Sequence, residues 1–325
     1  MAIPLWKLLM RGFGSLIFQP SPGTGGSVSA RYCYSVFMRH RIIAAQHGLN
    51  ITPKTVLEIG PGDSLGVGLM ALLTGSEQYI AIDVVCHASP RRNIDVLDDL
   101  VKLLESKSPI PSDGECAEIL PKLASYEFPH TLFEQVDFTK MLAPRRLNRI
   151  RAELLGTVSS EMIQYVAPMG KMEEVKKENI DWILSQAVLE HIDDLEEVYA
   201  GCFRHLTPNG IMTHQIDYQC HETAKEWNGH WKYSSWLWAI MRGRLPWFVN
   251  RKPHSTHQKL LSNAGFLICR EYLEKRTSQL AANQLSRDYS SLSVSDLTTA
   301  GAMLVSKKKE GTVTLSSSRE RAVHA

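Results

Sequence analysis

The stretch TVLEIGPGDS, residues 55–64, decides the fold of this 325-residue chain. Its first five residues predict a short strand, because apolar and β-branched side chains dominate a run that a glycine-rich segment ends. Gly60 and Gly62 then predict a tight turn, where the missing side chains let the backbone approach a ligand closely. The stretch therefore predicts a strand that leads into a ligand-binding turn.

The residues after the turn continue the same structural unit. The apolar run 65–73 predicts a helix that stops at Gly75, and residues 79–82 predict a second strand that ends at Asp83. Strand, glycine turn, helix, strand and acid, in this order, are typical of the first βαβ unit of a nucleotide-binding fold. Asp83 is then placed to accept hydrogen bonds from both hydroxyls of a ribose.

The glycine spacing separates two classes of nucleotide site. A dinucleotide site has the pattern G-x-G-x-x-G, and Leu65 stands where its third glycine belongs. Glu58 precedes the first glycine by two residues, where a carboxylate can attract the ammonium group of a cofactor that is an amino acid. A nicotinamide-dependent oxidoreductase is therefore the weaker alternative.

Residues 56–63 resemble motif I of the class I S-adenosylmethionine-dependent methyltransferases, and Asp83 matches the ribose-binding acid of that superfamily. Residues 180–191 resemble the strand-four segment of its small-molecule members, and residues 206–210 resemble their turn before strand five. The resemblance covers about 50–310. It implies a Rossmann-like α/β fold with a seven-stranded, mostly parallel sheet, helices on both faces and two insertions. It implies S-adenosyl-L-methionine as the cofactor, held by Glu58, Gly60, Pro61, Gly62, Asp63, Asp83, Val84, Ser185, Gln186 and Ala187.

Three segments, 62–66, 186–191 and 214–217, look like a bacterial subgroup of these enzymes from surface-polysaccharide or secondary-metabolite pathways. The resemblance thus implies a transferase (EC 2.1.1.-) that methylates a small-molecule acceptor, at an oxygen of a sugar or related metabolite. A catalytically silent cofactor-binding partner or scaffold protein is the alternative from another class. The chain departs from the family's pattern after its predicted third strand, where no acid follows and the expected adenine contacts are Pro168, Met169 and Gly170.

Breaks in the pattern predict the domain organisation. Residues 1–49 are expected to be an N-terminal helical extension, residues 50–310 the methyltransferase domain, and residues 311–325 a disordered polar tail. Two insertions interrupt the domain, at about 107–160 and 218–252. The first is rich in proline and could cover the site.

Methyl transfer from a sulfonium is an in-line displacement, so the enzyme must mainly align donor and acceptor, and an oxygen acceptor also benefits from a base. Asp217 and His221 follow the predicted fifth strand, 211–216, at the sheet edge where ligands bind. They are the predicted catalytic residues. His214 lies inside the strand and is interpreted as a core histidine, and no metal site is predicted. The residues expected to contact the acceptor are His191, Trp227, His230, Arg251 and His254.

The first eighteen residues are apolar but interrupted by Lys7 and Arg11, so they predict neither a signal peptide nor a membrane span. Gly12 and Gly14 weaken a helix there. An apolar helical stripe could dock on the protein body, which we favour, or make peripheral contact with a membrane surface. The stripe would consist of Leu5, Leu8, Leu9, Phe13, Leu16 and Ile17.

The bulk composition agrees with an ordinary globular enzyme. The net charge is +2, with 44% hydrophobic and 22% charged residues, so the charge balance indicates no nucleic-acid partner. The six cysteines form no C-x-x-C pair, which argues against a disulfide framework or a zinc cluster. Reduced thiols in a cytoplasmic protein are the simplest interpretation.

Overall fold

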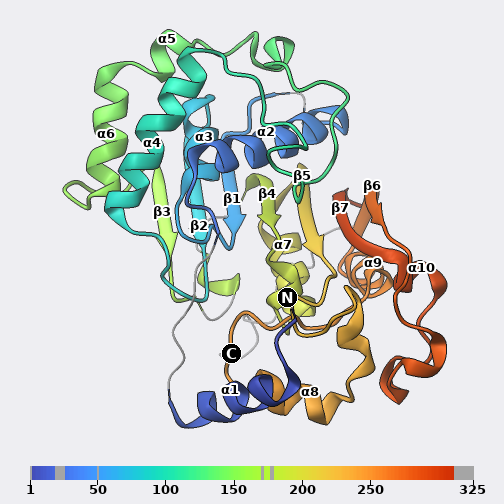
Figure 1. Cartoon of the computed structure of the whole chain (residues 1–325). Coiled ribbons are helices and arrows are strands. Elements are labelled where there is room, and N and C mark those ends of the chain that lie inside the picture. The colour runs from blue at the N-terminus through green and yellow to red at the C-terminus, as the bar shows by residue number, and fades with distance from the viewer. Residues whose placement is uncertain (1, 19–25, 50, 170–171, 176–178, 311–325) are drawn as a thin grey trace, which may run out of the picture.

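A seven-stranded sheet runs through the computed structural model, which describes residues 2–18, 26–49, 51–169, 172–175 and 179–310 (Figure 1). The strand order is β3-β2-β1-β4-β5-β7-β6, and adjacent strands are parallel except where β7 pairs with β5 and β6. The predicted mostly parallel α/β sheet is confirmed. The strands are β1 (Thr55–Ile59), β2 (Gln78–Ile82), β3 (Ile163–Val166), β4 (Ile180–Gln186), β5 (Leu206–Asp217), β6 (Phe266–Lys275) and β7 (Thr299–Lys308).

Helices cover both faces of the sheet, and each face has its own apolar core. The first core lies under α2 (Ala30–Gln46), α3 (Gly66–Leu73), α4 (Pro90–Glu105) and α6 (Pro144–Leu154). The second lies under α7 (Leu195–His205) and α9 (His254–Asn263). The remaining α-helices are α1 (Leu5–Ile17), α5 (Phe138–Met141), α8 (Ser235–Arg242) and α10 (Val294–Thr298). Short 3₁₀ helices are η1 (His130–Phe133), η2 (Met172–Glu174), η3 (Leu189–His191), η4 (Gly229–Lys232), η5 (Ala282–Gln284) and η6 (Arg287–Tyr289).

The strand order reverses at β1, because the chain first builds outward to β2 and β3 and then returns to place β4 on the other side of β1. Ligands of such sheets bind beyond the carboxyl ends of the strands at this reversal. Gly60 directly follows β1, Asp83 follows β2 and Ala187 follows β4. The topology therefore brings three of the predicted cofactor-binding residues to one edge.

Helix α3 packs unusually close to β2. A Cβ atom at Gly68 would lie 1.9 Å from the ring of Tyr79, and one at Gly66 would lie 2.5 Å from the Cys33 sulfur. In dinucleotide-binding folds the third glycine of the fingerprint allows this close helix–strand packing. Here Gly68 provides it, while Gly66 lets Cys33 of α2 pack closely on α3 and Leu65 occupies the position of that glycine.

Replacing Gly68 with alanine should lower the free energy of unfolding by about 1–3 kcal/mol, the typical cost of overpacking a core. The added methyl group would overlap the ring of Tyr79, which is fully buried. Urea denaturation measures the change. Gly14→Ala is the matched control, because nothing lies within 4 Å of a Cβ atom there and alanine favours the helix. Equal stability of Gly68→Ala and the wild type would contradict the packing argument.

Asp194 is the N-cap of α7, because its carboxylate accepts a hydrogen bond from the Glu197 N–H at 3.0 Å. Asp193 instead forms an ion pair of 2.6 Å with Arg242 of α8. Two adjacent aspartates are equivalent caps locally, so the ion pair with a distant helix is what distinguishes them.

Helix α1 docks on α8, as favoured, but through a different face from the predicted stripe. Leu8, Gly12 and Ser15 are buried, and a Cβ atom at Gly12 would lie 2.0 Å from the Ile240 carbonyl oxygen. The close approach at Gly12 therefore selects the docked face. Apart from buried Leu8 and half-buried Leu9, the predicted stripe is exposed: Leu5, Phe13, Leu16 and Ile17.

No helix in the described ranges is both long and apolar enough to cross a bilayer. The expected tail, 311–325, and the expected adenine contact Gly170 lie outside the described residues.

The segment 107–160 packs on the sheet face of α2 and α4, and its residues Glu118 and Leu120 form hydrogen bonds with Gln215 near the carboxyl end of β5. Its residues Ile119, Phe128 and Ile150 belong to the first apolar core. Arg39 of α2 holds the segment through hydrogen bonds to the carbonyls of Pro111, Ile119 and Pro121. A buried arginine with several carbonyl partners fixes the segment in place.

Candidate functional site

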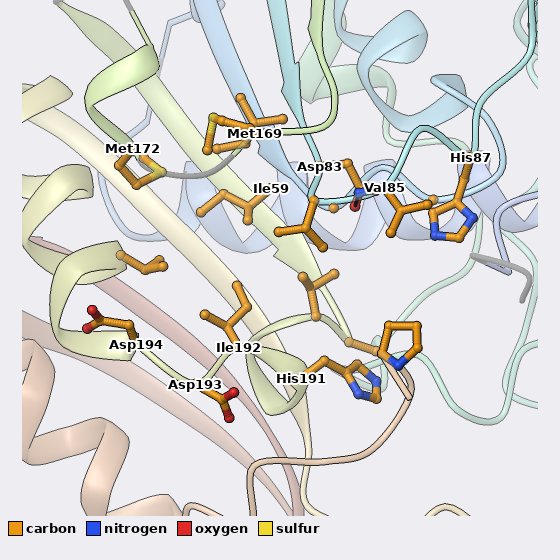
Figure 2. Close-up of a pocket in the computed structure, with 18 of the residues that line it drawn as sticks. Ile59, Asp83, Val85, His87, Met169, Met172, His191, Ile192, Asp193 and Asp194 are labelled. Carbon is orange, nitrogen blue, oxygen red and sulfur yellow. Dashed lines mark hydrogen bonds between the residues drawn. The ribbon is translucent and has the colours of Figure 1, made fainter. Parts of the chain in front are cut away.

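A cavity of about 520 Å³ opens at the carboxyl ends of β1, β2 and β4 (Figure 2). Figure 2 shows Ile59, Asp83 and Val85 on one side of it, and Ile192 and His191 on the other. The predicted cofactor residues that line the cavity are Gly60, Gly62, Asp83, Val84 and Ala187. The predicted residues that do not line it are Glu58, Pro61, Asp63, Ser185 and Gln186.

The glycine turn forms the floor of the cavity. Gly60 and Gly62 have φ values of +70° and +74°, a region that side chains disfavour. The Gly60 N–H donates to the Ile82 carbonyl at 2.8 Å, which ties the turn to the end of β2. A Cβ atom at Gly60 would lie 2.5 Å from a methyl carbon of Val188. Both the backbone conformation and the close neighbour therefore require glycine at position 60.

Asp83 presents a carboxylate to the cavity. One of its oxygens accepts a hydrogen bond from the Val85 N–H at 3.2 Å, and its own carbonyl accepts from the Met169 N–H at 2.8 Å. Burial raises the pKa of the Asp83 carboxyl. Met169, one of the residues expected near the adenine, also lines the cavity. These hydrogen bonds fix the position of Asp83 relative to Met169, the residue expected to contact the adenine.

Glu58 lies on the other face of β1 from the cavity. Its carboxylate is buried below α3 and accepts a hydrogen bond of 2.5 Å from the Tyr79 hydroxyl. Burial raises the pKa of Glu58 to about 7, against the opposing effect of the Tyr79 hydrogen bond. Ile59, the next residue, faces the cavity. The structure therefore leaves Glu58 out of the cavity lining, and its side chain supports the strand that carries the turn.

Pro61 and Asp63 bind the chain segment just before α2. The Ser27 hydroxyl donates to the Pro61 carbonyl at 2.6 Å, and the Gly26 N–H donates to Asp63 Oδ2 at 2.9 Å. The Ser64 N–H in turn donates to the Ser27 hydroxyl at 2.9 Å. The outer side of the glycine turn is thus occupied by protein. Sequence reasoning missed this role for Ser27, and no local pattern indicates it.

Of the cofactor residues predicted at the end of β4, Ala187 lines the cavity, while Ser185 and Gln186 do not. Ser185 is buried and lies 2.8 Å from His214 Nδ1, while Gln186 Oε1 lies 3.0 Å from His40 Nε2. Both side chains therefore fix the neighbouring strand and α2 rather than a ligand. Ala187 has a φ of +51°, and its N–H donates to the Gln215 carbonyl at 3.0 Å.

The two predicted catalytic residues lie together beyond β5. His221 Nε2 is 3.1 Å from Asp217 Oδ2, and the His221 ring is 5.2 Å from the ring of His191, which lines the cavity. Burial tends to raise the pKa of Asp217, but the hydrogen bond and charge of His221 lower it overall. Burial, with the neighbouring His221, lowers the pKa of His191 to about 4. A carboxylate, its histidine partner and a neutral histidine thus adjoin the cavity.

The turn that carries His221 has a strained backbone. His221 and Glu222 have φ values of +44° and +63°, although neither is glycine. Such conformations cost about 1–3 kcal/mol each and are concentrated at functional sites. The turn brings the imidazole back to Asp217, four residues earlier in the chain.

The structure places four predicted acceptor contacts away from the cavity lining. The Trp227 indole N–H donates to the Thr277 carbonyl at 2.9 Å, and His230 is fully buried. Arg251 donates to the Tyr233 carbonyl at 2.7 Å, and its pKa is lowered by burial. His254 lies 3.2 Å from Glu271. These side chains stabilise the second insertion and its surroundings.

The second insertion nevertheless contributes to the cavity wall, through Pro246 and Trp247. Trp247 is not among the acceptor contacts that the sequence predicted. Trp247 lines the cavity and also packs on the ring of Phe248, with ring centroids 4.5 Å apart. In the part of the chain that the structure describes, no group of three or more His, Cys, Asp or Glu side chains could hold a metal ion.

A family model described as a methyltransferase domain matches residues 34–270. No curated protein matches the chain.

Several solved structures resemble this one. A candidate sarcosine dimethylglycine methyltransferase from Galdieria sulphuraria is 12% identical, with 84% of this chain and 85% of that chain covered and a TM-score of 0.43. Phosphoethanolamine N-methyltransferase 2 from Haemonchus contortus, in complex with S-adenosyl-L-methionine, is 13% identical, with coverages of 86% and 57% and a TM-score of 0.41. An S-adenosylmethionine-dependent methyltransferase from Mesorhizobium loti is 10% identical, with coverages of 78% and 90% and a TM-score of 0.37. Identities this low say nothing about the acceptor of this chain.

Proposed function

This chain belongs to the methyltransferase domain family, with S-adenosyl-L-methionine as its cofactor, and from this premise we propose that it methylates an oxygen of a small-molecule acceptor, a sugar or related metabolite. The observation that carries the proposal is the meeting of Gly60, Gly62, Asp83 and Ala187 around one cavity at the reversal point of the sheet. All six cysteines are free, which supports work in a reducing, cytoplasmic compartment.

The cavity fits the cofactor in size and chemistry. Its volume of about 520 Å³ lies within the range of small-molecule sites, about 300–1,000 Å³. A Cβ atom at Gly60 would collide with Val188, which also lines the cavity, and the Asp83 carboxylate stands at the end of β2, where a ribose is bound in such folds. Bound there, the cofactor supplies an activated methyl group on its sulfonium.

We assign the residues of this chain separate tasks in cofactor binding. The backbone of Gly60 and Gly62 approaches the amino-acid portion, and Asp83 accepts hydrogen bonds from the two ribose hydroxyls. Val84 and Met169 supply apolar surface for the adenine. Ordered contacts at several points align the donor before the acceptor arrives.

On the acceptor side, His221 acts as the general base that takes the proton from the acceptor hydroxyl. Asp217 orients its imidazole and stabilises the imidazolium that forms, through the 3.1 Å contact to Nε2. With its pKa lowered to about 4, His191 stays neutral at pH 7 and adds no second positive charge beside that imidazolium. The remaining imidazole nitrogen of His221, Nδ1, is the one that would receive the proton.

His221→Ala is expected to reduce turnover about 100-fold or more, within the range of general-base catalysis, while cofactor affinity stays nearly unchanged. His221 does not line the cavity that would hold the cofactor, so its loss should lower turnover without changing cofactor affinity. Mass spectrometry of an acceptor panel after incubation with labelled cofactor measures turnover, and calorimetry measures affinity. His130→Ala, at an exposed histidine of η1, is the control. Wild-type turnover in His221→Ala would remove His221 from catalysis.

The same measurements separate the proposal from its alternatives. Saturable S-adenosylmethionine binding without any methylated product would favour a silent cofactor-binding protein. Saturable NAD binding without S-adenosylmethionine binding would overturn the proposal altogether.

A further inference from the structure

Helix α1 carries a second apolar face that nothing in the described structure covers. Trp6, Met10, Phe13 and Ile17 are spaced by four, three and four residues, so they form one stripe along the helix. Their exposed fractions are 59%, 66%, 61% and 66%. This stripe, called here the α1 stripe, lies on the opposite side of the helix from the docked residues Leu8, Gly12 and Ser15.

The docked face fixes the helix, so the α1 stripe cannot turn inward. Besides the close approach at Gly12, the Ser15 hydroxyl accepts a hydrogen bond from the Arg244 N–H at 2.8 Å, and the Ile3 N–H donates to the Glu222 carbonyl at 2.8 Å. Helices α1 and α8 lie together at the lower edge of the molecule in Figure 1, away from the helices α3 to α6. Exposed apolar surface on this scale marks an interaction site.

The residues of α1 beside the α1 stripe carry positive charge and no negative charge, which favours an anionic partner. Lys7 and Arg11 are exposed on one flank of the α1 stripe, and the first 57 residues of the chain contain no aspartate or glutamate. The sequence of α8 also contains no acid, and its Trp236 is 68% exposed. Tryptophan and large apolar side chains beside lysine and arginine are the composition of helices that lie in a bilayer interface and attract anionic lipid.

We propose that α1 and α8 form a docking surface for a lipid bilayer that contains anionic headgroups. The α1 stripe enters the interface between headgroups and acyl chains, while Lys7 and Arg11 reach the phosphates. Leu8 of α1 belongs to an apolar cluster with Trp238, Met241, Phe248 and Val249. Trp247, which lines the cavity, packs against this cluster. Docking therefore holds one wall of the cavity close to the bilayer. This surface is independent of the methyl-transfer proposal, since it includes none of the residues assigned there.

The test is cosedimentation of the full-length protein with vesicles of phosphatidylcholine alone or of phosphatidylcholine mixed with phosphatidylglycerol. We expect binding to the mixed vesicles that weakens as salt rises, and at least a tenfold loss of binding in Phe13→Glu. Lys7→Glu with Arg11→Glu should remove the preference for phosphatidylglycerol. Val294→Glu is the matched control, because Val294 is a 77% exposed apolar residue on α10, far from α1 in the chain, and should leave binding unchanged.

Three results would overturn the proposal: no vesicle binding by the wild type, equal binding by Phe13→Glu, or a dimer in solution that Phe13→Glu dissociates. The dimer would show that a second copy covers the α1 stripe. Cofactor affinity measured on the same variants should stay at the wild-type value, which shows that each variant is folded. A failure of the docking surface is thereby distinguished from a failure of the proposed function.

Discussion

Asp83→Ala is expected to weaken S-adenosylhomocysteine binding about 100-fold or more, measured by titration calorimetry. The carboxylate would accept hydrogen bonds from two ribose hydroxyls, and a hydrogen bond to a charged group contributes about 1.5–3 kcal/mol. Losing two of them costs about 3 kcal/mol at the lower limit, which is slightly more than a factor of 100. The effect should be large because Asp83 lines the cavity and is partly shielded from water.

Two further variants make this test specific. Asp83→Asn keeps the shape of the side chain but loses its charge, so its affinity should fall between those of the wild type and Asp83→Ala. Asp99→Ala removes an exposed acid of α4, outside the cavity, and should bind as the wild type does. If Asp83→Ala also bound as the wild type does, the ribose would have to lie elsewhere and the cofactor pose would be wrong.

The sequence predicted the elements around the glycine turn well, because their signals are local. Strand β1 covers the predicted residues, and α3 and β2 differ from the prediction by one residue each. Apolar periodicity and glycine are properties of neighbouring residues, so they need no knowledge of tertiary contacts. The same local signals placed Gly60, Gly62 and Asp83 at one edge of the sheet, where the cavity is found.

Glu58 is one predicted cofactor residue that the structure leaves out of the cavity lining. Side chains along a strand alternate between its two faces, so Glu58 and Ile59 cannot both face the cavity. Ile59 does, and Glu58 faces Tyr79 of the neighbouring strand. The pairing of Glu58 with Ala81 places Tyr79 two residues away along β2, on the same face. The sequence alone indicates that Glu58 and Ile59 point to opposite faces of β1. Identifying Tyr79 as the partner of Glu58 also required the register between β1 and β2.

The acceptor side could not be predicted residue by residue, because long-range contacts decide which polar side chains of the second insertion are already used. Arg251 looks like an anion-binding residue in sequence, yet its guanidinium lies 4.8 Å from the Trp238 ring and 4.7 Å from the Tyr289 ring. Those rings come from different segments of the chain. Asp217 and His221, by contrast, are four residues apart at the end of β5, so the sequence could place them together, and they are in contact at 3.1 Å.

Acid is expected to destabilise the fold steeply between pH 6.5 and 4. Burial lowers the pKa values of His40 and His191 to about 4 and those of His214, His230 and His257 to about 3. In the unfolded chain a histidine takes up its proton near pH 6.5, so within this window the unfolded state binds more protons than the folded state. Stability must therefore fall as the pH falls through the window.

Three buried carboxyls act in the opposite direction. Burial raises the pKa of Asp83, that of Glu58 to about 7 and that of Glu190 well above its usual value, so the folded state keeps protons that the unfolded state has released above pH 4.5. Five histidines against three carboxyls leave about two protons in favour of the unfolded state. Each proton changes stability by about 1.4 kcal/mol per pH unit, so the free energy of unfolding should fall by about 3 kcal/mol between pH 6 and 5.

Urea denaturation at a series of pH values measures this dependence of stability on pH. One variant tests whether the buried histidines cause it. His214→Asn removes a titrating group while its amide can replace Nδ1 at 2.8 Å from the Ser185 hydroxyl, so the slope should fall by about one proton. His130→Asn changes an exposed histidine and should leave the slope unchanged. A free energy of unfolding that stays constant or rises toward acid would show that these histidines accept protons in the folded state. In that case the cores on both sides of β5 would have to be more accessible to water than their burial indicates.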